Sequence, residues 1–274
     1  MTIYLRRPFH IPEYEITADC SYFMESLCLQ YGKYINNVIG DNMSNVYKII
    51  VTKKSDNDYM FEHIGGMTAT ADPLYEIDEI LFNTTTYDSS ILALHGAAVE
   101  YNGYAYIFLA PTTTGKTTLT AYLTNDNFGY ITEDCILIDR QTLTVYPYAC
   151  PVHLRSGGVE VLQRYGITIP NMQIFGDPAG TRYVYTPSNC VTVPLPLGRI
   201  YFIERGETEN RVTNMSTSAS MIELMKSPIT VYPLSGEYIR LISTLAKVGC
   251  KRVIYRDMEY IRDIIIEDSR NEYR

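Results

Sequence analysis

The chain has 274 residues, of which 46% are hydrophobic and 20% are charged, values typical of a globular protein and not of a disordered one. It contains no apolar run of the roughly 18 residues that a membrane-spanning helix needs, and its first residues lack the apolar core of a secretion signal. The formal net charge of -8 argues against nucleic-acid binding. We therefore expect a cytoplasmic protein that binds neither nucleic acid nor a membrane.

The negative charge is concentrated at the start of the chain. Residues 1–90 hold 13 acidic and 6 basic side chains, whereas residues 91–274 hold 18 and 17. This change in composition predicts a domain boundary near residue 90. The acidic part is open to two interpretations: a solvated face that keeps the protein soluble, or a surface that binds a substrate or partner.

Residues 1–90 are predicted to form a small β-rich domain of the α+β class. The run at 46–51 is typical of a strand, and residues 59–64 are predicted to pair with it as a hairpin that ends at Gly65-Gly66. Residues 21–29 are predicted to form a short helix. No motif with recognisable chemistry lies in this part, so its role stays open.

Residues 91–274 alternate between strand and helix patterns. Residues 92–101 and 104–109 are predicted to flank a hairpin turn at Asn102-Gly103, and the second run is apolar enough to be buried on both faces. The mixture predicts an α/β domain with a mixed sheet and flanking helices. The other predicted helices are 116–123, 159–165, 218–226, 237–248 and 258–267, and the other predicted strands are 130–138, 142–148, 200–204 and 252–255.

A phosphate-binding motif follows the apolar strand. It matches the pattern G-x-x-x-x-G-K-S/T, with alanine in place of the first glycine, and the following helix would present its N-terminus to a phosphate chain. Gly115 permits a backbone conformation that a β-carbon would hinder, Lys116 would attract the outer phosphates, and Thr117 would offer a hydroxyl to Mg²⁺. The alternative is a threonine-rich surface turn. The motif consists of Ala110, Pro111, Thr112, Thr113, Thr114, Gly115, Lys116, Thr117 and Thr118.

Two adjacent carboxylates, Glu133 and Asp134, follow Lys116 by about 17 residues and are predicted to lie on the next strand. One would hold Mg²⁺ and the other would accept the proton of an attacking hydroxyl. Their roles are expected to differ, because neighbours on a strand point to opposite faces. Without the phosphate-binding motif, a solvated pair at a strand end would be the better interpretation.

Two further residues are candidates for the same site. His95 stands in an apolar stretch, and it would either orient the catalytic base or contact a phosphate. The alternative is a histidine of the core with ordinary hydrogen-bond partners. Arg155 would steady the transferring phosphate, or it is a surface residue. Lys116 is expected to contribute little to packing, because it stands where a loop meets a helix.

Taken together, these motifs resemble the catalytic domain of the HPr kinase/phosphorylase family. The resemblance rests on residues 94–99 with their His95-Gly96 pair, on Asn102-Gly103, on the phosphate-binding motif and on Glu133-Asp134, where the family has two aspartates. The motif is also similar to that of phosphoenolpyruvate carboxykinases, which share the wider fold. Residues 151–158 and 194–206 are similar to segments of HPr-kinase-like proteins encoded beside genes for ribosomally made peptides.

The resemblance covers about residues 91–270 and implies transfer of a phosphoryl group from ATP, with Mg²⁺, to a hydroxyl, often a serine of a protein or peptide. It implies that Lys116 and Thr117 bind the nucleotide phosphates and Mg²⁺. It assigns the base and further metal binding to Asp134 with Glu133, and support of the base to His95. HPr itself is not expected as the substrate.

Three alternatives stay open at this point. The first is a nucleotide sensor without transfer activity, and the second is a kinase for the hydroxyl of a small molecule. The third, which fits the short chain less well, is a carboxykinase-like enzyme. The sequence leaves the acceptor, the reverse reaction and homo-oligomerisation undecided.

Overall fold

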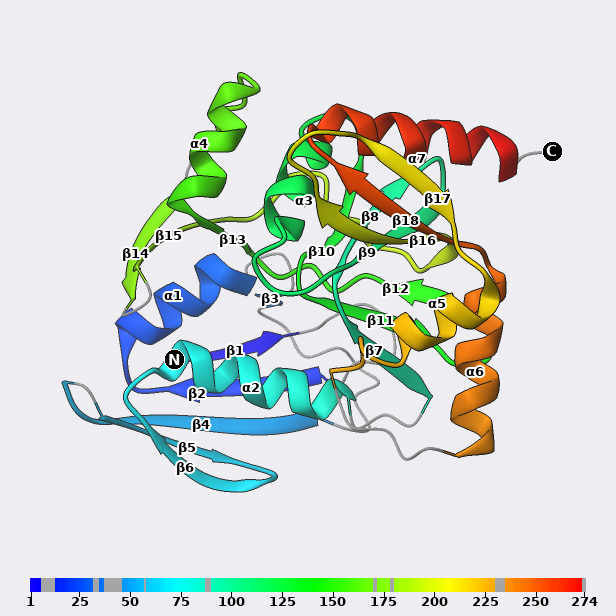
Figure 1. Ribbon diagram of the computed structural model, residues 1–274. Coiled ribbons are helices and arrows are strands. Elements are labelled where there is room, and N and C mark those ends of the chain that lie inside the picture. Colours follow the sequence, from blue (N-terminus) through cyan, green and yellow to red (C-terminus); the bar gives the residue numbers. More distant parts are fainter. Residues whose placement is uncertain are drawn as a thin grey trace. The chain divides into compact units, whose positions relative to one another are not determined.

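The computed structural model describes residues 1–5, 13–31, 35–36, 46–56, 58–86, 90–169, 172–177, 180–229 and 235–272. The chain divides into two compact units, Met1–Ser89 and Ser90–Arg274, which are described separately (Figure 1). Among the described residues, no helix is both long and apolar enough to span a membrane.

The N-terminal unit is built on a six-stranded sheet with the order β3-β1-β2-β4-β5-β6. Strands β2 and β4 run parallel, and the other neighbours are antiparallel. The predicted hairpin is confirmed by the pairing of β4 with β5, and the predicted helix is α1. The elements are β1 (Thr2–Leu5), β2 (Glu13–Ala18), α1 (Ser21–Tyr31), β3 (Ile35–Asn36), β4 (Val46–Ser55), β5 (Asp58–His63), β6 (Gly66–Thr70) and α2 (Pro73–Thr86).

The core of the N-terminal unit forms where this sheet meets its two helices. Alternate residues of β2 are buried, as expected for a strand with one face against a core. Phe23 of α1 and Phe61 of β5 are fully buried and meet edge to face, with ring centroids 5.9 Å apart. The unit is therefore an α+β structure, as its sequence predicts.

The C-terminal unit contains a nine-stranded mixed sheet and a separate three-stranded sheet among its described residues. The strand order is β10-β8-β9-β16-β12-β11-β7, and β18 pairs with both β16 and β17. The elements up to β13 are β7 (Ile91–His95), β8 (Ala97–Tyr101), β9 (Tyr104–Leu109), α3 (Lys116–Thr124), β10 (Gly129–Thr132), β11 (Cys135–Asp139), β12 (Thr144–Tyr146) and β13 (Val152–Arg155). The remaining elements are α4 (Ser156–Arg164), β14 (Gln173–Asp177), β15 (Gly180–Tyr185), β16 (Leu195–Arg205), β17 (Arg211–Asn214), α5 (Thr217–Leu224), α6 (Gly236–Lys247), β18 (Cys250–Tyr255) and α7 (Met258–Glu272).

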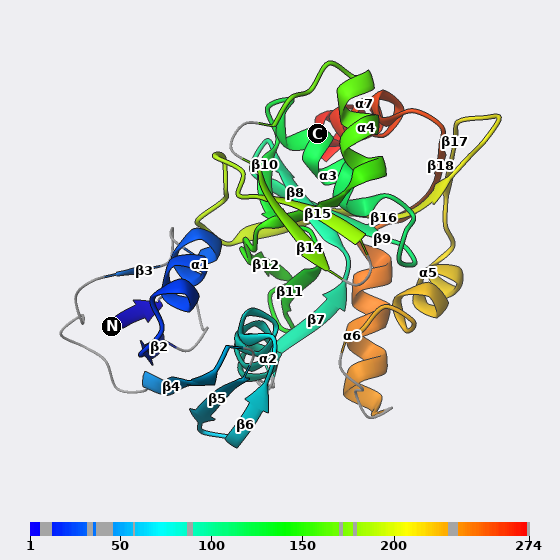
Figure 2. The same ribbon diagram turned by 90° about the vertical axis from the view of Figure 1, so that its left-hand side faces the viewer.

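Strand β9 is buried on both faces, which confirms the prediction from its apolar run. Ala105, Ile107 and Leu109 pack in a cluster with residues of α5 and α6. On the other face, Tyr106 and Phe108 stack with Tyr201 of β16, which contacts α7. Helices α3, α4 and α7 lie together over that second face (Figure 2). The strand that leads into the phosphate-binding motif is therefore fixed from both sides.

The predicted strand at 130–138 was wrong as a single element. The chain forms two strands instead, and Glu133-Asp134 make the bend between them. Strand β10 pairs with β8, whereas β11 pairs with β7 and β12, so the two strands join different neighbours. The acidic pair therefore lies at a change of direction and not along a strand.

A close approach of backbones explains the glycine after His95. A β-carbon on Gly96 would lie 2.6 Å from the carbonyl oxygen of Phe108 and 2.7 Å from a methyl carbon of Ile136. The Gly96 N–H donates to the carbonyl oxygen of Asp134 at 3.1 Å. Only glycine allows β7, β9 and the acidic bend to come this close.

We predict that Gly96→Ala lowers the free energy of unfolding of the C-terminal unit by about 1–3 kcal/mol, because its methyl group would collide with backbone and with packed side chains. Scanning calorimetry measures the change in the transition of this unit. Gly157→Ala is the matched control, because a β-carbon there meets nothing within 4 Å. Equal transitions for the two variants would contradict the packing argument.

Candidate active site

The phosphate-binding motif forms a tight turn between β9 and α3. Thr113 and Gly115 have φ angles of +70° and +99°, in the left-handed region. Glycine adopts this conformation readily, but in Thr113 it costs about 1–2 kcal/mol. Both the N–H and the hydroxyl of Thr114 donate to the carbonyl oxygen of Pro111, at 3.4 and 2.9 Å. Because α3 begins immediately after Gly115, free N–H groups of its first turn lie at this loop.

Lys116 is more deeply placed than the sequence suggested. Only 6% of the residue is exposed, and Nζ donates to the carbonyl oxygens of Ala110 and Pro111 at 2.8 and 3.2 Å. Burial lowers the pKa of Lys116, while the nearby Asp134 and Glu133 raise it. The expectation that Lys116 contributes little to packing was therefore wrong: its ammonium group closes the loop on itself.

Glu133 is a buried carboxylate beside the start of α3. Its Oε1 accepts the backbone N–H of His153 at 2.8 Å, and the hydroxyl of Thr117 also hydrogen-bonds to the carboxylate. Burial raises the pKa of Glu133 from 4.5 to about 7, and these two hydrogen bonds oppose the rise. The structure thus joins Glu133 to the threonine that the motif predicts as a metal ligand.

Asp134 differs from its neighbour because its side chain is exposed. Its Oδ1 lies 3.1 Å from Nδ1 of His95. The hydrogen bond from His95 holds the pKa of Asp134 below its usual value, although desolvation raises it. The acidic pair therefore contains one buried carboxyl and one exposed carboxylate that a histidine orients.

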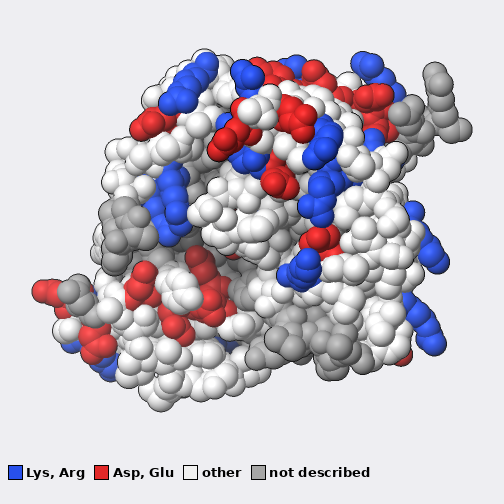
Figure 3. Space-filling view, in the orientation of Figure 1, with Lys and Arg blue, Asp and Glu red and all other residues white. Residues whose placement is uncertain are grey.

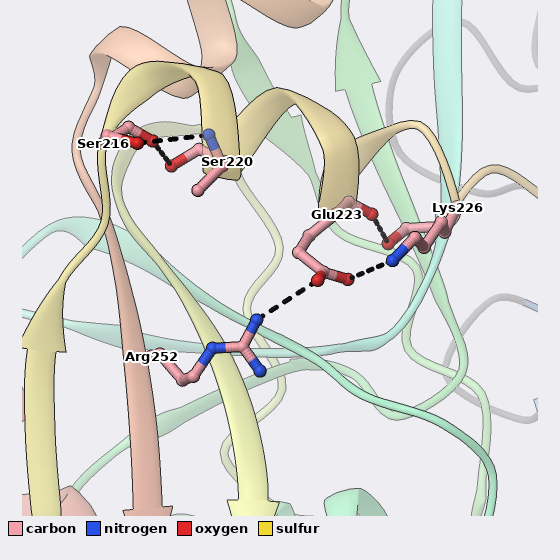
Figure 4. Close-up of polar contacts among 7 residues, drawn as sticks. Ser216, Ser220, Glu223, Lys226 and Arg252 are labelled. Atoms are coloured by element: carbon pink, nitrogen blue, oxygen red, sulfur yellow. Dashed lines mark hydrogen bonds and ion pairs between the residues drawn. The ribbon is translucent and has the colours of Figure 1, made fainter.

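A network of polar contacts surrounds α5 (Figure 4). Ser216 caps the helix, because its hydroxyl accepts the N–H of Ala219 at 3.3 Å. Glu223 binds Arg252 of β18 at 3.1 Å and Lys226 at 3.2 Å.

The chain leaving α5 reaches His95 directly. The hydroxyl of Ser227 donates to the carbonyl oxygen of Glu223 at 3.1 Å, and the carbonyl oxygen of Ser227 accepts the N–H of His95 at 2.8 Å. The backbone of His95 is thus tied, through α5, to β18, which pairs with the central strand β16.

Strand β13 contributes a residue that sequence reasoning did not assign to the site. His153 supplies its N–H to Glu133, and burial lowers the pKa of its imidazole, an effect that the charge of Arg182 increases. Arg182 of β15 also lowers the pKa of Glu133. His153 stands in the segment 151–158 with no role assigned to it, and Arg182 stands outside the motifs. Pairing between β13 and β15 brings both residues to the acidic pair.

Arg155 lies at the end of β13, directly opposite Arg182 in the strand pairing. Its side chain is exposed and makes no ion pair with any carboxylate of the described ranges. Alternate residues of a strand share a face, so Arg155, His153 and Arg182 lie on one side of the small sheet. The structure therefore adds a second guanidinium to the one that the sequence singled out.

The remaining motif residues divide between the surface and the packing of α3. Pro111, Thr112 and Thr113 are exposed. Thr118 packs against α4, where a β-carbon on Gly158 would lie 2.8 Å from its hydroxyl oxygen. Thr118, the last residue of the motif, thus contributes to the contact between α3 and α4.

The donor set around Glu133 fits Mg²⁺. The hydroxyl of Thr117 and the carboxylate of Glu133 are hard oxygen ligands, and Asp134 adds a third at the same bend. In the part of the chain that the structure describes, no three acidic, histidine or cysteine side chains form a metal cage. Such a sparse set is typical of Mg²⁺ sites that take their other ligands from water and phosphate.

The charge on the visible surface differs between the two units. In Figure 3, acidic side chains predominate on the N-terminal unit, whereas both signs are mixed over the C-terminal unit. This agrees with the uneven charge of the sequence.

No protein-family model matches the chain, and no curated protein matches it. Among solved structures, the HPr(Ser) kinase/phosphatase from Coxiella burnetii resembles it distantly, with a TM-score of 0.32 and 7% identity over 64% of this chain and 97% of that chain. At that level of similarity, function has to be argued from the residues of the site.

We predict that the free energy of unfolding falls with rising pH because of Glu133, in protein without added divalent cation. The pKa of its carboxyl is raised in the folded state, so its stabilising contribution is complete below about pH 4.5 and is lost as the pH rises through about 7. The pKa difference corresponds to about 3 kcal/mol.

Glu133→Gln tests this pH dependence, because glutamine keeps the shape of the side chain but does not titrate. Denaturation at pH 5 and pH 8 should show the variant gaining stability relative to the original protein as the pH rises. A constant difference between the two proteins would contradict the assigned burial.

Proposed function

We propose that this protein is an ATP- and Mg²⁺-dependent kinase that transfers the γ-phosphoryl group to a hydroxyl, with a serine of a peptide or protein as the expected acceptor. One observation carries the proposal: Thr117, at the start of the helix after the phosphate-binding turn, hydrogen-bonds to the buried Glu133. This contact supports the proposal, because phosphoryl transfer needs a phosphate-binding loop and acidic side chains close together.

The phosphate loop would bind the nucleotide through its backbone and through Lys116. The N–H groups at the start of α3, at the positive end of the helix dipole, would bind phosphate oxygens. The ammonium group of Lys116 would exchange its bonds to the carbonyl oxygens of Ala110 and Pro111 for phosphate oxygens. Because its pKa is lowered only by burial, nearby phosphate charge would favour its protonated form.

The buried carboxyl group of Glu133 and the exposed one of Asp134 would have different roles. Glu133 and Thr117 would hold Mg²⁺, which neutralises charge on the phosphates when it is bound. Asp134 is exposed and ionised, so its carboxylate can reach an acceptor hydroxyl and take its proton. His95 would keep that carboxylate oriented, and Arg155 and Arg182 would attract the anionic groups on the β13 side.

The acceptor is the least constrained part of the proposal. A serine hydroxyl of a peptide or protein follows from the sequence resemblance, and a small-molecule alcohol is the alternative. The separate N-terminal unit, with its acidic surface, is proposed to bind the partner that presents the hydroxyl, and residues 91–274 are proposed as the nucleotide-binding catalytic domain. Labelled ATP with panels of serine peptides and of small alcohols would distinguish the two acceptor classes.

A nucleotide sensor is the competing function. A sensor needs the phosphate loop, but it does not need an exposed carboxylate held by a histidine at 3.1 Å. Binding of ATP with no transfer to any acceptor, unchanged in a Glu133→Ala and Asp134→Ala double variant, would favour the sensor.

We predict that Lys116→Met abolishes phosphoryl transfer, with a loss of at least about 100-fold in kcat/KM, because the charge that binds the outer phosphates is removed. Methionine fills the buried space better than alanine, so the fold should persist. Circular dichroism checks the fold, and transfer of label from ATP measures activity. A variant with undiminished transfer would overturn the assignment of the loop.

We predict that Asp134→Asn lowers kcat by about 100-fold or more while changing the affinity for ATP less than about threefold, since only the acceptance of a proton is lost. Isothermal titration and steady-state kinetics measure the two quantities. Asp139→Asn, in the same unit at the far end of β11, is the control for loss of one carboxylate. A loss of ATP affinity as large as the loss in kcat would indicate that Asp134 binds the metal ion and is not the base.

A further inference from the structure

We propose that Arg205, at the end of β16, binds the phosphates of the nucleotide that stay in the ADP product, and that Tyr255 positions both Arg205 and the phosphate loop. This inference rests on the proposed nucleotide-dependent function and adds two residues, on β16 and β18, to the nucleotide-binding site. It follows from three observations at the end of β18: a contact to the loop, a stacked guanidinium and the order of the strands.

Tyr255 touches the phosphate loop directly. Its ring is 1% exposed, and its hydroxyl donates to the carbonyl oxygen of Thr114 at 3.1 Å. A β-carbon on Gly115 would lie 3.0 Å from the same hydroxyl oxygen. Tyr255 therefore contacts the loop at Thr114 and Gly115, the two residues that precede Lys116.

Arg205 lies against the same tyrosine. Its guanidinium carbon is 5.1 Å from the centre of the Tyr255 ring, a cation–π contact. Burial raises the pKa of the Tyr255 hydroxyl, and the charge of Arg205 and a hydrogen bond from it oppose that rise. Arg205 is itself exposed, and it has no carboxylate partner among the described residues. A positive charge is thus held one side chain away from the loop, with no ion-pair partner in the described ranges.

Strand order places this charge on the side of the loop opposite the acidic pair. Strands β9, β16 and β18 run parallel, with Leu109 beside Phe202 and Arg205 beside Tyr255. Ligands bind beyond the carboxyl ends of such strands. Glu133 follows β10, which lies on the other side of β9. If the transferring phosphoryl group faces Glu133 and Asp134, the rest of the phosphate chain faces Arg205.

The backbone around Arg205 is held before any ligand binds. The N–H of Gly206 donates to the carbonyl oxygen of Tyr255 at 2.8 Å, and a β-carbon on Gly206 would lie 2.7 Å from a methyl carbon of Ile254. Asn210 accepts the N–H of Arg256 at 2.7 Å. These contacts fasten the turn after β16 to the end of β18, so binding would order little more than the arginine side chain.

Binding of Mg-ADP and Mg-ATP to the full chain, measured by isothermal titration, tests the proposal. Arg205→Gln should weaken both nucleotides by about tenfold and to the same extent, because a charge-assisted contact to shared phosphates is lost. Arg205→Lys should recover part of the affinity. Arg240→Gln, which removes an exposed arginine of α6, should change neither affinity.

Tyr255→Phe tests the positioning role, because it keeps the ring below Arg205 and removes only the hydroxyl group, with its bonds to Thr114 and to Arg205. We expect weaker binding of both nucleotides. Tyr201→Phe is the matched control: it also removes a buried hydroxyl bond, to Asp268 at 2.7 Å, and should lower the melting temperature without changing nucleotide affinity.

Three outcomes would overturn the inference. Unchanged ADP affinity in Arg205→Gln would leave Arg205 a structural partner of the tyrosine ring. A loss confined to ATP would place Arg205 on the transferring phosphoryl group. Failure of the unaltered protein to bind either nucleotide would refute the proposed function itself, whereas tight binding that ignores Arg205 would refute only the further inference.

Discussion

The burial of one carboxyl group, that of Glu133, is the constraint on which the candidate active site depends. A buried carboxylate is costly unless hydrogen bonds compensate for the lost water. The backbone N–H of His153 and the hydroxyl of Thr117 provide them, and they come from β13 and α3. The same group therefore fixes the small sheet against the helix that follows the phosphate loop. A cation bound beside Glu133 would stabilise its buried carboxylate and so offset the cost of burying the charge.

Exposure separates the two acidic residues more clearly than their types do. The strand pattern predicts that the two neighbours point to opposite faces and therefore differ in role. In the structure, the bend between β10 and β11 buries Glu133 and leaves Asp134 at the surface beside His95. A metal-holding role suits the first, and contact with an acceptor suits the second. Gly96 makes this arrangement feasible, because any larger residue would push β7 away from the bend.

Sequence patterns predicted the structure correctly where a short segment of the chain determines its own conformation. The apolar run of β9, the Asn102-Gly103 turn and the start of α3 were predicted because burial, turn geometry and the phosphate motif are properties of short segments. The bend at Glu133 was missed because the flanking residues form one continuous apolar pattern. His153 and Arg182 were missed because only pairing between strands brings them to the site. The burial of Lys116 was missed because the loop folds back over its own lysine.

The order of the strands gives the site a direction. The loop after β9 lies between the acidic bend that follows β10 and the Arg205–Tyr255 pair at the ends of β16 and β18. Negative groups on one side repel phosphate unless a cation lies between them, whereas a guanidinium on the other side attracts it directly. In the proposed site, Mg²⁺ at the acidic bend would draw the terminal phosphate toward Glu133, which leaves the retained phosphates to face Arg205. The reactive end would then lie near Asp134, the exposed carboxylate that we propose as the base for an incoming hydroxyl.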